Sequence, residues 1–350
     1  MKNICLTLSF IACAIFFTGM NCAKAQTSSD ALVYMESISM LFTTIMDDTW
    51  DYTSTVAHSK SAKKIDSKRK DLLETLDEAK NKISRMPDFE GDASYRDTVL
   101  AFLTIDFDVL NNDYSKIVDM EELAESSYDM MEAYLLAQEI AGNKLDTANS
   151  NLIAQQKVFA EKHNINIIDN EDKVSKKLES SAKVFKYYNK IYLIFFKSYK
   201  QDAYLWNAIT NKDLSSIEQN KNALLKSAME GLALLDSIKA YKSDIALMTA
   251  CKKALIFYKS EAVTKLQDIV DYYICTDKFD KINTAFEAKD KASLTQAELD
   301  EYNSAVEEVN KAGVKYNTAN QKLTAERNTV IEGWNTAGQT FLDKHVPQYK

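Results

Sequence analysis

Three histidines offer the widest choice of chemistry in this chain, because imidazole can bind a metal ion or transfer a proton. They are His58, His163 and His345, and the last two end the similar clusters "EKH" and "DKH". A metal site shared by the two clusters is one hypothesis. The E-x-x-H spacing of di-iron helical bundles is absent, so we favour helix ends whose basic residues interact with the helix dipole. We therefore predict no metal site.

Other catalytic patterns are equally incomplete. The segment "DFEGD", Asp88 to Asp92, resembles a calcium loop, but an EF-hand needs glycine at its sixth position and glutamate at its twelfth. Counted from Asp88, Gly91 is fourth and Val99 is twelfth, which indicates a turn. The chain has no G-x-S-x-G elbow, no phosphate-binding glycine loop and no arguable Cys-His pair. We predict that the protein is not an enzyme and holds no cofactor.

The most unusual stretch is "VFKYYNKIYLIFFKSYKQDAYLW", Val184 to Trp206. Its aromatic side chains recur at helical spacing, and a face this broad is typical of a helix packed on several sides. Tyrosines also suit a partner or ligand surface, because a hydroxyl lies beside an apolar ring. A third alternative is a segment that inserts into membranes, although four lysines interrupt it. The candidate interaction residues here are Tyr187, Tyr188, Tyr192, Tyr199 and Trp206.

The N-terminus has the layout of a secretory signal peptide. Lys2 precedes an apolar run from Ile4 to Phe17, and an A-x-A site ends at Ala25. We expect export to the periplasm or the cell surface, with cleavage after Ala25. The alternative is a lipid anchor on Cys22, although Gly19, Met20 and Asn21 fit a lipoprotein signal poorly.

Charge and hydropathy exclude two classes of partner for the mature chain. Without Lys2 and Lys24, 41 basic residues face 51 acidic ones, a net charge of −10. An acidic surface repels nucleic acid and anionic lipid heads. Apolar runs such as Tyr192 to Phe196 are far too short for a transmembrane segment. We expect an unknown protein or envelope component as the partner.

Few helix breakers and a 3.6-residue apolar rhythm predict an all-α fold. The mature chain has only two prolines, Pro87 and Pro347, and its stripes include Leu32, Met35 and Ile38. We expect capping-box starts at Asp119–Glu122, Ser215–Glu218 and Ser293–Gln296.

An internal repeat organises these helices. "AGNKLDTANSNLIA", Ala141 to Ala154, and "AGVKYNTANQKLTA", Ala312 to Ala325, are identical at eight of 14 positions. We predict two tandem four-helix-bundle-like units related by duplication: residues 1–25 form the signal peptide, 26–168 the first unit and 169–350 the second.

The second unit carries an insertion of about 19 residues, Cys275 to Ser293, by comparison of the repeat offsets. We expect a loop there, because loops on rigid scaffolds commonly carry recognition. Phe279 and Phe286 are therefore further candidate interaction residues.

The signal, the long helices and the missing catalytic motifs together resemble a group of uncharacterised all-helical surface proteins and lipoproteins exported by Gram-negative bacteria. The resemblance is one of organisation, and it implies no particular residue role. We expect a non-enzymatic exported protein with a partner-binding or structural role. The alternative function is a membrane-perturbing or pore-forming protein that uses the aromatic helix 184–206.

Overall fold

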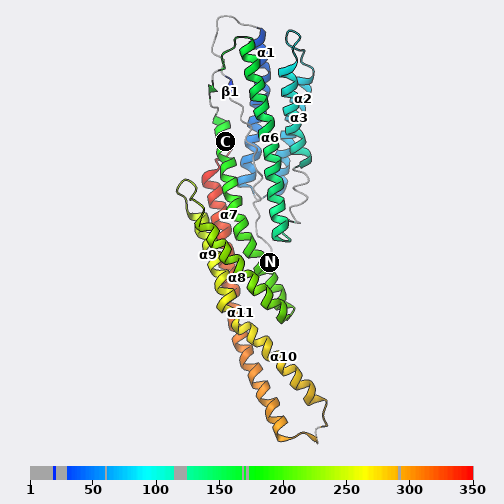
Figure 1. Ribbon diagram of the computed structural model, residues 1–350, viewed down its shortest axis with the longest axis vertical. Coiled ribbons are helices and arrows are strands. Elements are labelled where there is room, and N and C mark those ends of the chain that lie inside the picture. The colour runs from blue at the N-terminus through cyan, green and yellow to red at the C-terminus, as the bar shows by residue number, and fades with distance from the viewer. Residues whose placement is uncertain are drawn as a thin grey trace. The chain divides into compact units, whose positions relative to one another are not determined.

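The computed structural model describes residues 19–20, 30–59, 61–113, 124–167, 169–170, 173–290 and 293–349 of the 350-residue chain. Helices dominate these residues, and the all-α prediction is confirmed (Figure 1). The helices of the first part are α1 (Asp30–His58), α2 (Ala62–Ser84), α3 (Ser94–Asp108), the π-helix η1 (Val109–Asp113) and α6 (Tyr128–Lys162). The later ones are α7 (Lys173–Thr210), α8 (Leu214–Asp236), α9 (Ala246–Ser260), the π-helix η2 (Glu261–Lys265), α10 (Gln267–Glu287) and α11 (Gln296–His345).

The described strands are two dipeptides, β1 (Gly19–Met20) and β2 (Asp169–Asn170). They pair antiparallel, with Gly19 opposite Asn170. β1 lies in the segment for which we predict cleavage.

Local capping explains where several helices begin. We predicted a cap for α8 at Ser215. The side chain of Asp213 instead accepts a hydrogen bond from the backbone N–H of Ser216, so Asp213 is the cap. Thr295 and Glu298 bond each other's backbone N–H groups, which makes a capping box at the start of α11. The predicted start at Asp119 lies outside the described residues, and α6 begins after Ser127.

The chain divides into two compact units. Unit 1 comprises Met1–Lys190 and Gly338–Lys350, and unit 2 comprises Ile191–Ala337. The boundaries between these two compact units lie inside α7 and α11. The predicted ranges 26–168 and 169–350 follow the repeat instead, and they stay a prediction about ancestry.

In unit 1, α1 packs on α2, α2 on α3, and α3 on α6. Aromatic contacts fill its interior: the rings of Phe42 and Phe102 lie 5.8 Å apart, and those of Tyr95 and Phe159 lie 5.1 Å apart. Burial of rings of this size contributes to the apolar stabilisation of the unit.

In unit 2, the later part of α7 meets α8, α9 and α11. The rings of Phe195 and Trp334 stack with centroids 4.3 Å apart, and Trp334 is 2% exposed. Gly231 lets α8 approach its neighbours, because a Cβ there would lie 3.0 Å from Cδ1 of Leu255. It would also lie 3.2 Å from Cγ2 of Ile194.

The element bounds recur along the chain. α2 and α8 each have 23 residues and begin at positions 62 and 214, which are 152 apart. α3 and α9 each have 15 residues and begin at 94 and 246, and the five-residue π-helices begin at 109 and 261. Isolated bridges, Phe89 with Asp92 and Tyr241 with Asp244, keep the same spacing of 152.

A helix that crosses a bilayer must be both long and apolar. No helix among the described residues is both long enough and apolar enough to cross a membrane.

Candidate interaction site

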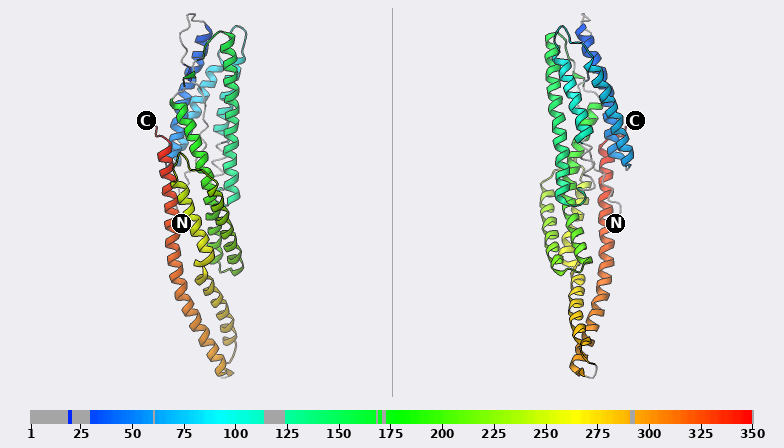
Figure 2. Two further views of the ribbon diagram at one scale, coloured as in Figure 1. Left: turned by 60° about the vertical axis from the view of Figure 1, so that its left-hand side comes forward. Right: turned by 90° about the vertical axis from the view of Figure 1, so that its right-hand side faces the viewer.

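Unit 2 carries a two-helix extension. α10 and the first part of α11 run side by side beyond the ends of α8 and α9 (Figures 1 and 2). We call residues 274–322 the arm, of which 274–290 and 293–322 are described. Among these described arm residues, Ala305 alone is buried. The arm therefore has a seam between two helices but no enclosed core.

The predicted insertion lies at the end of the arm, but the loop prediction is wrong for most of it. Residues 275–287 continue α10, and the turn to α11 occupies only 288–295. The segment lacks glycine and proline, and Lys281 pairs with Asp277 one helical turn away at 2.7 Å. Phe279, Ile282 and Phe286 recur at helical spacing, so nothing in the segment ends the helix early.

Aromatic rings join the two helices of the arm. Phe286 stacks on Tyr302 with centroids 4.3 Å apart, and Phe279 lies 5.9 Å from the same ring. Nearer the base, Tyr272 lies 4.7 Å from Tyr316. Along α11 the inner positions recur with spacings of three and four: Leu299, Tyr302, Val306, Val309, Gly313 and Tyr316. This is the spacing of a coiled-coil seam, here between antiparallel helices.

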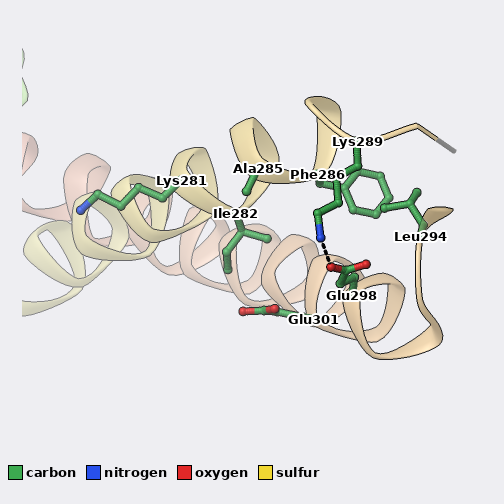
Figure 3. A pocket seen from close by; sticks show the side chains of 8 residues that line it. All are labelled: Lys281, Ile282, Ala285, Phe286, Lys289, Leu294, Glu298 and Glu301. Atoms are coloured by element: carbon green, nitrogen blue, oxygen red, sulfur yellow. Dashed lines mark hydrogen bonds and ion pairs between the residues drawn. The ribbon is translucent and has the colours of Figure 1, made fainter.

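A pocket of about 240 Å³ opens at the end of this seam. Its apolar lining comes from Ile282, Ala285, Phe286 and Leu294, and Figure 3 shows the Phe286 ring beside Leu294. Charged side chains also line the pocket, Lys281 and Lys289 from the α10 side and Glu298 and Glu301 from α11. An apolar floor with charged groups around it is the composition expected of a protein-binding surface.

Charge is distributed unevenly over the arm. The first 15 residues of α11, 296–310, contain five carboxylates and no basic residue. Lys289 pairs with Glu298 and holds its pKa well below the usual value, and Lys278 lies 3.1 Å from Glu308. Glu301 has no ion-pair partner within the described part of the chain. Glu301 is therefore a carboxylate at the pocket without an ion pair among the described residues, and Lys281, which pairs with Asp277, lines the same pocket.

A second cluster of charges lies in the interior of unit 2. Arg327 of α11 donates from Nε to Asp202 at 2.8 Å, and its Nη2 donates to Glu261. The guanidinium also lies over the ring of Trp206, 4.2 Å from its centroid, and the indole N–H donates to Glu261 at 3.0 Å. Asp202 and Glu261 are almost fully buried. Burial, followed by the nearby charge of Glu261, raises the pKa of Asp202.

This cluster connects three helical elements inside unit 2, and we call it an internal tie. One guanidinium serves two carboxylates and joins α7, η2 and α11. Buried ion pairs of this kind fix one arrangement of helices more than they add stability. We assign it a structural role in unit 2.

The aromatic stretch of α7 is shared between the two units. Tyr188 in unit 1 and Tyr192 in unit 2 are buried, which supports the core alternative for both. Tyr187 packs on Phe341 at 5.5 Å, and Tyr199 stacks on Phe195 at 5.8 Å. A partner-binding role for these tyrosines and for Trp206 stays a prediction. Cys22 lies outside the described residues.

The histidines lie at the ends of their helices. His163 follows α6 and contacts the rings of Phe89 and Phe159 at 4.9 and 4.5 Å, and His345 ends α11 beside Phe341 at 4.7 Å. His58 Nδ1 lies 2.8 Å from a carboxylate oxygen of Asp343. In the part of the chain that the structure describes, no three His, Cys, Asp or Glu side chains gather as metal ligands would.

Comparison of the chain with protein-family models, with curated proteins and with solved structures finds no match. The candidate site therefore rests on geometry. Of the predicted interaction residues, Phe286 lines the pocket, and Phe279 supports the seam beside it. The charged lining and the Arg327 cluster were not predicted.

Proposed function

We propose that this chain is a non-enzymatic exported protein that binds a protein partner in the periplasm or at the cell surface, and that the arm is its docking element. The signal-peptide layout with an A-x-A site at Ala25 supports export. The observation that carries the binding role is the pocket at the end of the arm, where Phe286 lies between two helices that enclose no core. Partly exposed aromatic rings at a hollow are typical anchors of protein interfaces.

The proposal includes the duplication of an ancestral helical unit. The common spacing of 152 residues between α2 and α8, α3 and α9, and η1 and η2 supports it, together with the sequence match in α6 and α11. A duplicated scaffold supplies two similar helical bodies, of which one has gained the arm. The added residues are then free to specialise in recognition.

Site-directed crosslinking tests the docking role. A photoreactive amino acid in place of Ala285 lies at the pocket, and one in place of Met229 serves as the control, since Met229 is exposed on α8 of the same unit. In cells that export the protein, we expect adducts of one defined mass at position 285 and none at position 229. Identical adducts at both positions would contradict the proposal.

A pair of arm variants checks that the pocket itself is responsible. Phe286→Ala should remove the adduct, because it takes away the apolar lining. The Phe279 ring contacts the same Tyr302 ring as Phe286 but does not line the pocket. Phe279→Ala should therefore leave the adduct in place. Circular dichroism of both variants checks that they remain helical.

A further inference from the structure

We propose that the partner segment is a basic amphipathic helix that lies along the arm as a third helix. It places an apolar side chain against Phe286 and a lysine or arginine against Glu301. The inference rests on the proposed docking function and adds the chemical class of the partner.

The seam geometry argues for a helix. The inner positions of α11 follow coiled-coil spacing over residues 299–316, and α10 meets them with Phe279 and Phe286. These inner side chains, apart from Ala305, are only half-buried. A third helix with apolar residues at the same spacing would cover them and complete a three-helix bundle.

The charges argue for a basic partner. Residues 296–310 of α11 carry five carboxylates and no cation. Glu298 and Glu308 are already paired with lysines of the arm, whereas Glu301 lies at the pocket without an ion-pair partner in the described chain (Figure 3). A cation at this position would gain a partner without breaking an existing pair.

The same charges disfavour a second copy of this chain as the occupant. The whole chain has a formal net charge of −8 and an isoelectric point near 5.2. Two such arms would bring their acidic α11 segments together, and like charges oppose association. A basic segment from another protein meets no such repulsion.

Fluorescence anisotropy with a model peptide tests the inference. The probe is a labelled helical peptide of leucine and lysine at coiled-coil spacing, and the comparison peptide has glutamate in place of every lysine. We expect the lysine peptide to bind the full mature chain and the glutamate peptide not to bind. Phe286→Ala should weaken binding at least about tenfold, and Met229→Ala, at an exposed position of α8 outside the arm, should change it less than about twofold.

Two charge-reversal variants separate the pocket from bulk attraction. Glu301→Lys should weaken binding about tenfold or more. Glu332→Lys makes the same change in net charge at an exposed position of α11 outside the arm, and should change the affinity less than about twofold. Equal losses in the two variants would show that only bulk charge attracts the peptide, and would overturn the inference.

The two proposals fail in different ways. If Ala285 crosslinks to one partner but the lysine peptide does not bind, the basic-helix inference is wrong and the docking role stands. If the peptide binds at Glu301 and Phe286 but no crosslink forms in cells, the proposed function is wrong and the chemistry of the surface stands.

Discussion

Arg327 and Asp202 form a direct ion pair of 2.8 Å in the interior of unit 2, and the same guanidinium bonds Glu261. Arg327→Ala would leave two buried carboxylates facing each other without a cation. We expect it to lower the free energy of unfolding by about 3–5 kcal/mol, measured by urea denaturation at pH 7. The loss should shrink as the pH falls, because a raised pKa of Asp202 favours its neutral form at lower pH.

Lys265→Ala is the matched control for this change. Its ammonium pairs with Glu326 of the same unit, but both side chains are 33% exposed, so solvent screens the pair. We expect a loss of about 0–1 kcal/mol. Equal losses in the two variants would contradict the assignment of the Arg327 cluster as a tie.

Asp106 should make the stability of unit 1 depend on pH. Its side chain is buried, and burial alone raises its pKa to about 7. The folded state therefore binds this proton more tightly than the unfolded chain does. The resulting contribution to the free energy of unfolding is fully present below about pH 4. It is lost as the pH rises through 7. The contribution is on the order of 4 kcal/mol.

Asp106→Asn should remove this part of the pH dependence and leave the protein more stable than the wild type at pH 8. Thermal denaturation at several pH values between 4 and 8 measures the difference. Asp108→Asn is the control, because Asp108 is exposed on the same helix. If both variants follow the wild-type profile, Asp106 does not titrate in this range.

Two glycines in unit 2 should respond oppositely to alanine. Gly231→Ala forces a methyl group to within 3.0 Å of Leu255, and overpacking of this kind costs about 1–3 kcal/mol. Gly333→Ala meets no atom within 4 Å, and it should stabilise α11 by about 0.5–1 kcal/mol through helix propensity. Chemical denaturation of both variants decides whether α8 and α9 are packed as closely as described.

The N-terminus of the protein isolated from cells distinguishes the two hypotheses for its processing. Cleavage after Ala25 predicts a first residue of Gln26 and an intact mass without acyl chains. Lipidation predicts a chain that begins at a modified Cys22, and Cys22→Ser would then abolish membrane association. Intact-mass spectrometry of the protein expressed from its full sequence separates these outcomes.

The sequence predicts the fold class well, because scarce breakers and long apolar stripes are properties of short windows. Segments of consistent period, such as Val184 to Trp206, form helices as expected. The structure of the insertion was harder to predict, because residues 275–287 form part of a helix and not the loop that we expected. The absence of glycine and proline and the helical spacing of Phe279, Ile282 and Phe286 mark that outcome in advance.

The candidate site could be predicted only in part, because the pocket is a tertiary feature. Phe286 and Glu301 are separated by the turn at 288–295, and their proximity follows only from the antiparallel course of α10 and α11. The sequence gives a clearer indication that Arg327 is buried with a charged partner. It lies at a core position of the α11 stripe between Leu323 and Trp334, where a charge needs a buried partner.

The arm's lack of an enclosed core has a consequence for how the molecule opens. Backbone groups held by few buried contacts escape their hydrogen bonds by local fraying, without unfolding of the whole domain. Amides of the described arm should therefore exchange with deuterium far sooner than those around Trp334, which is 2% exposed. A bound helix would slow that exchange selectively, so isotope uptake along residues 274–322 would report occupancy even before the ligand is known.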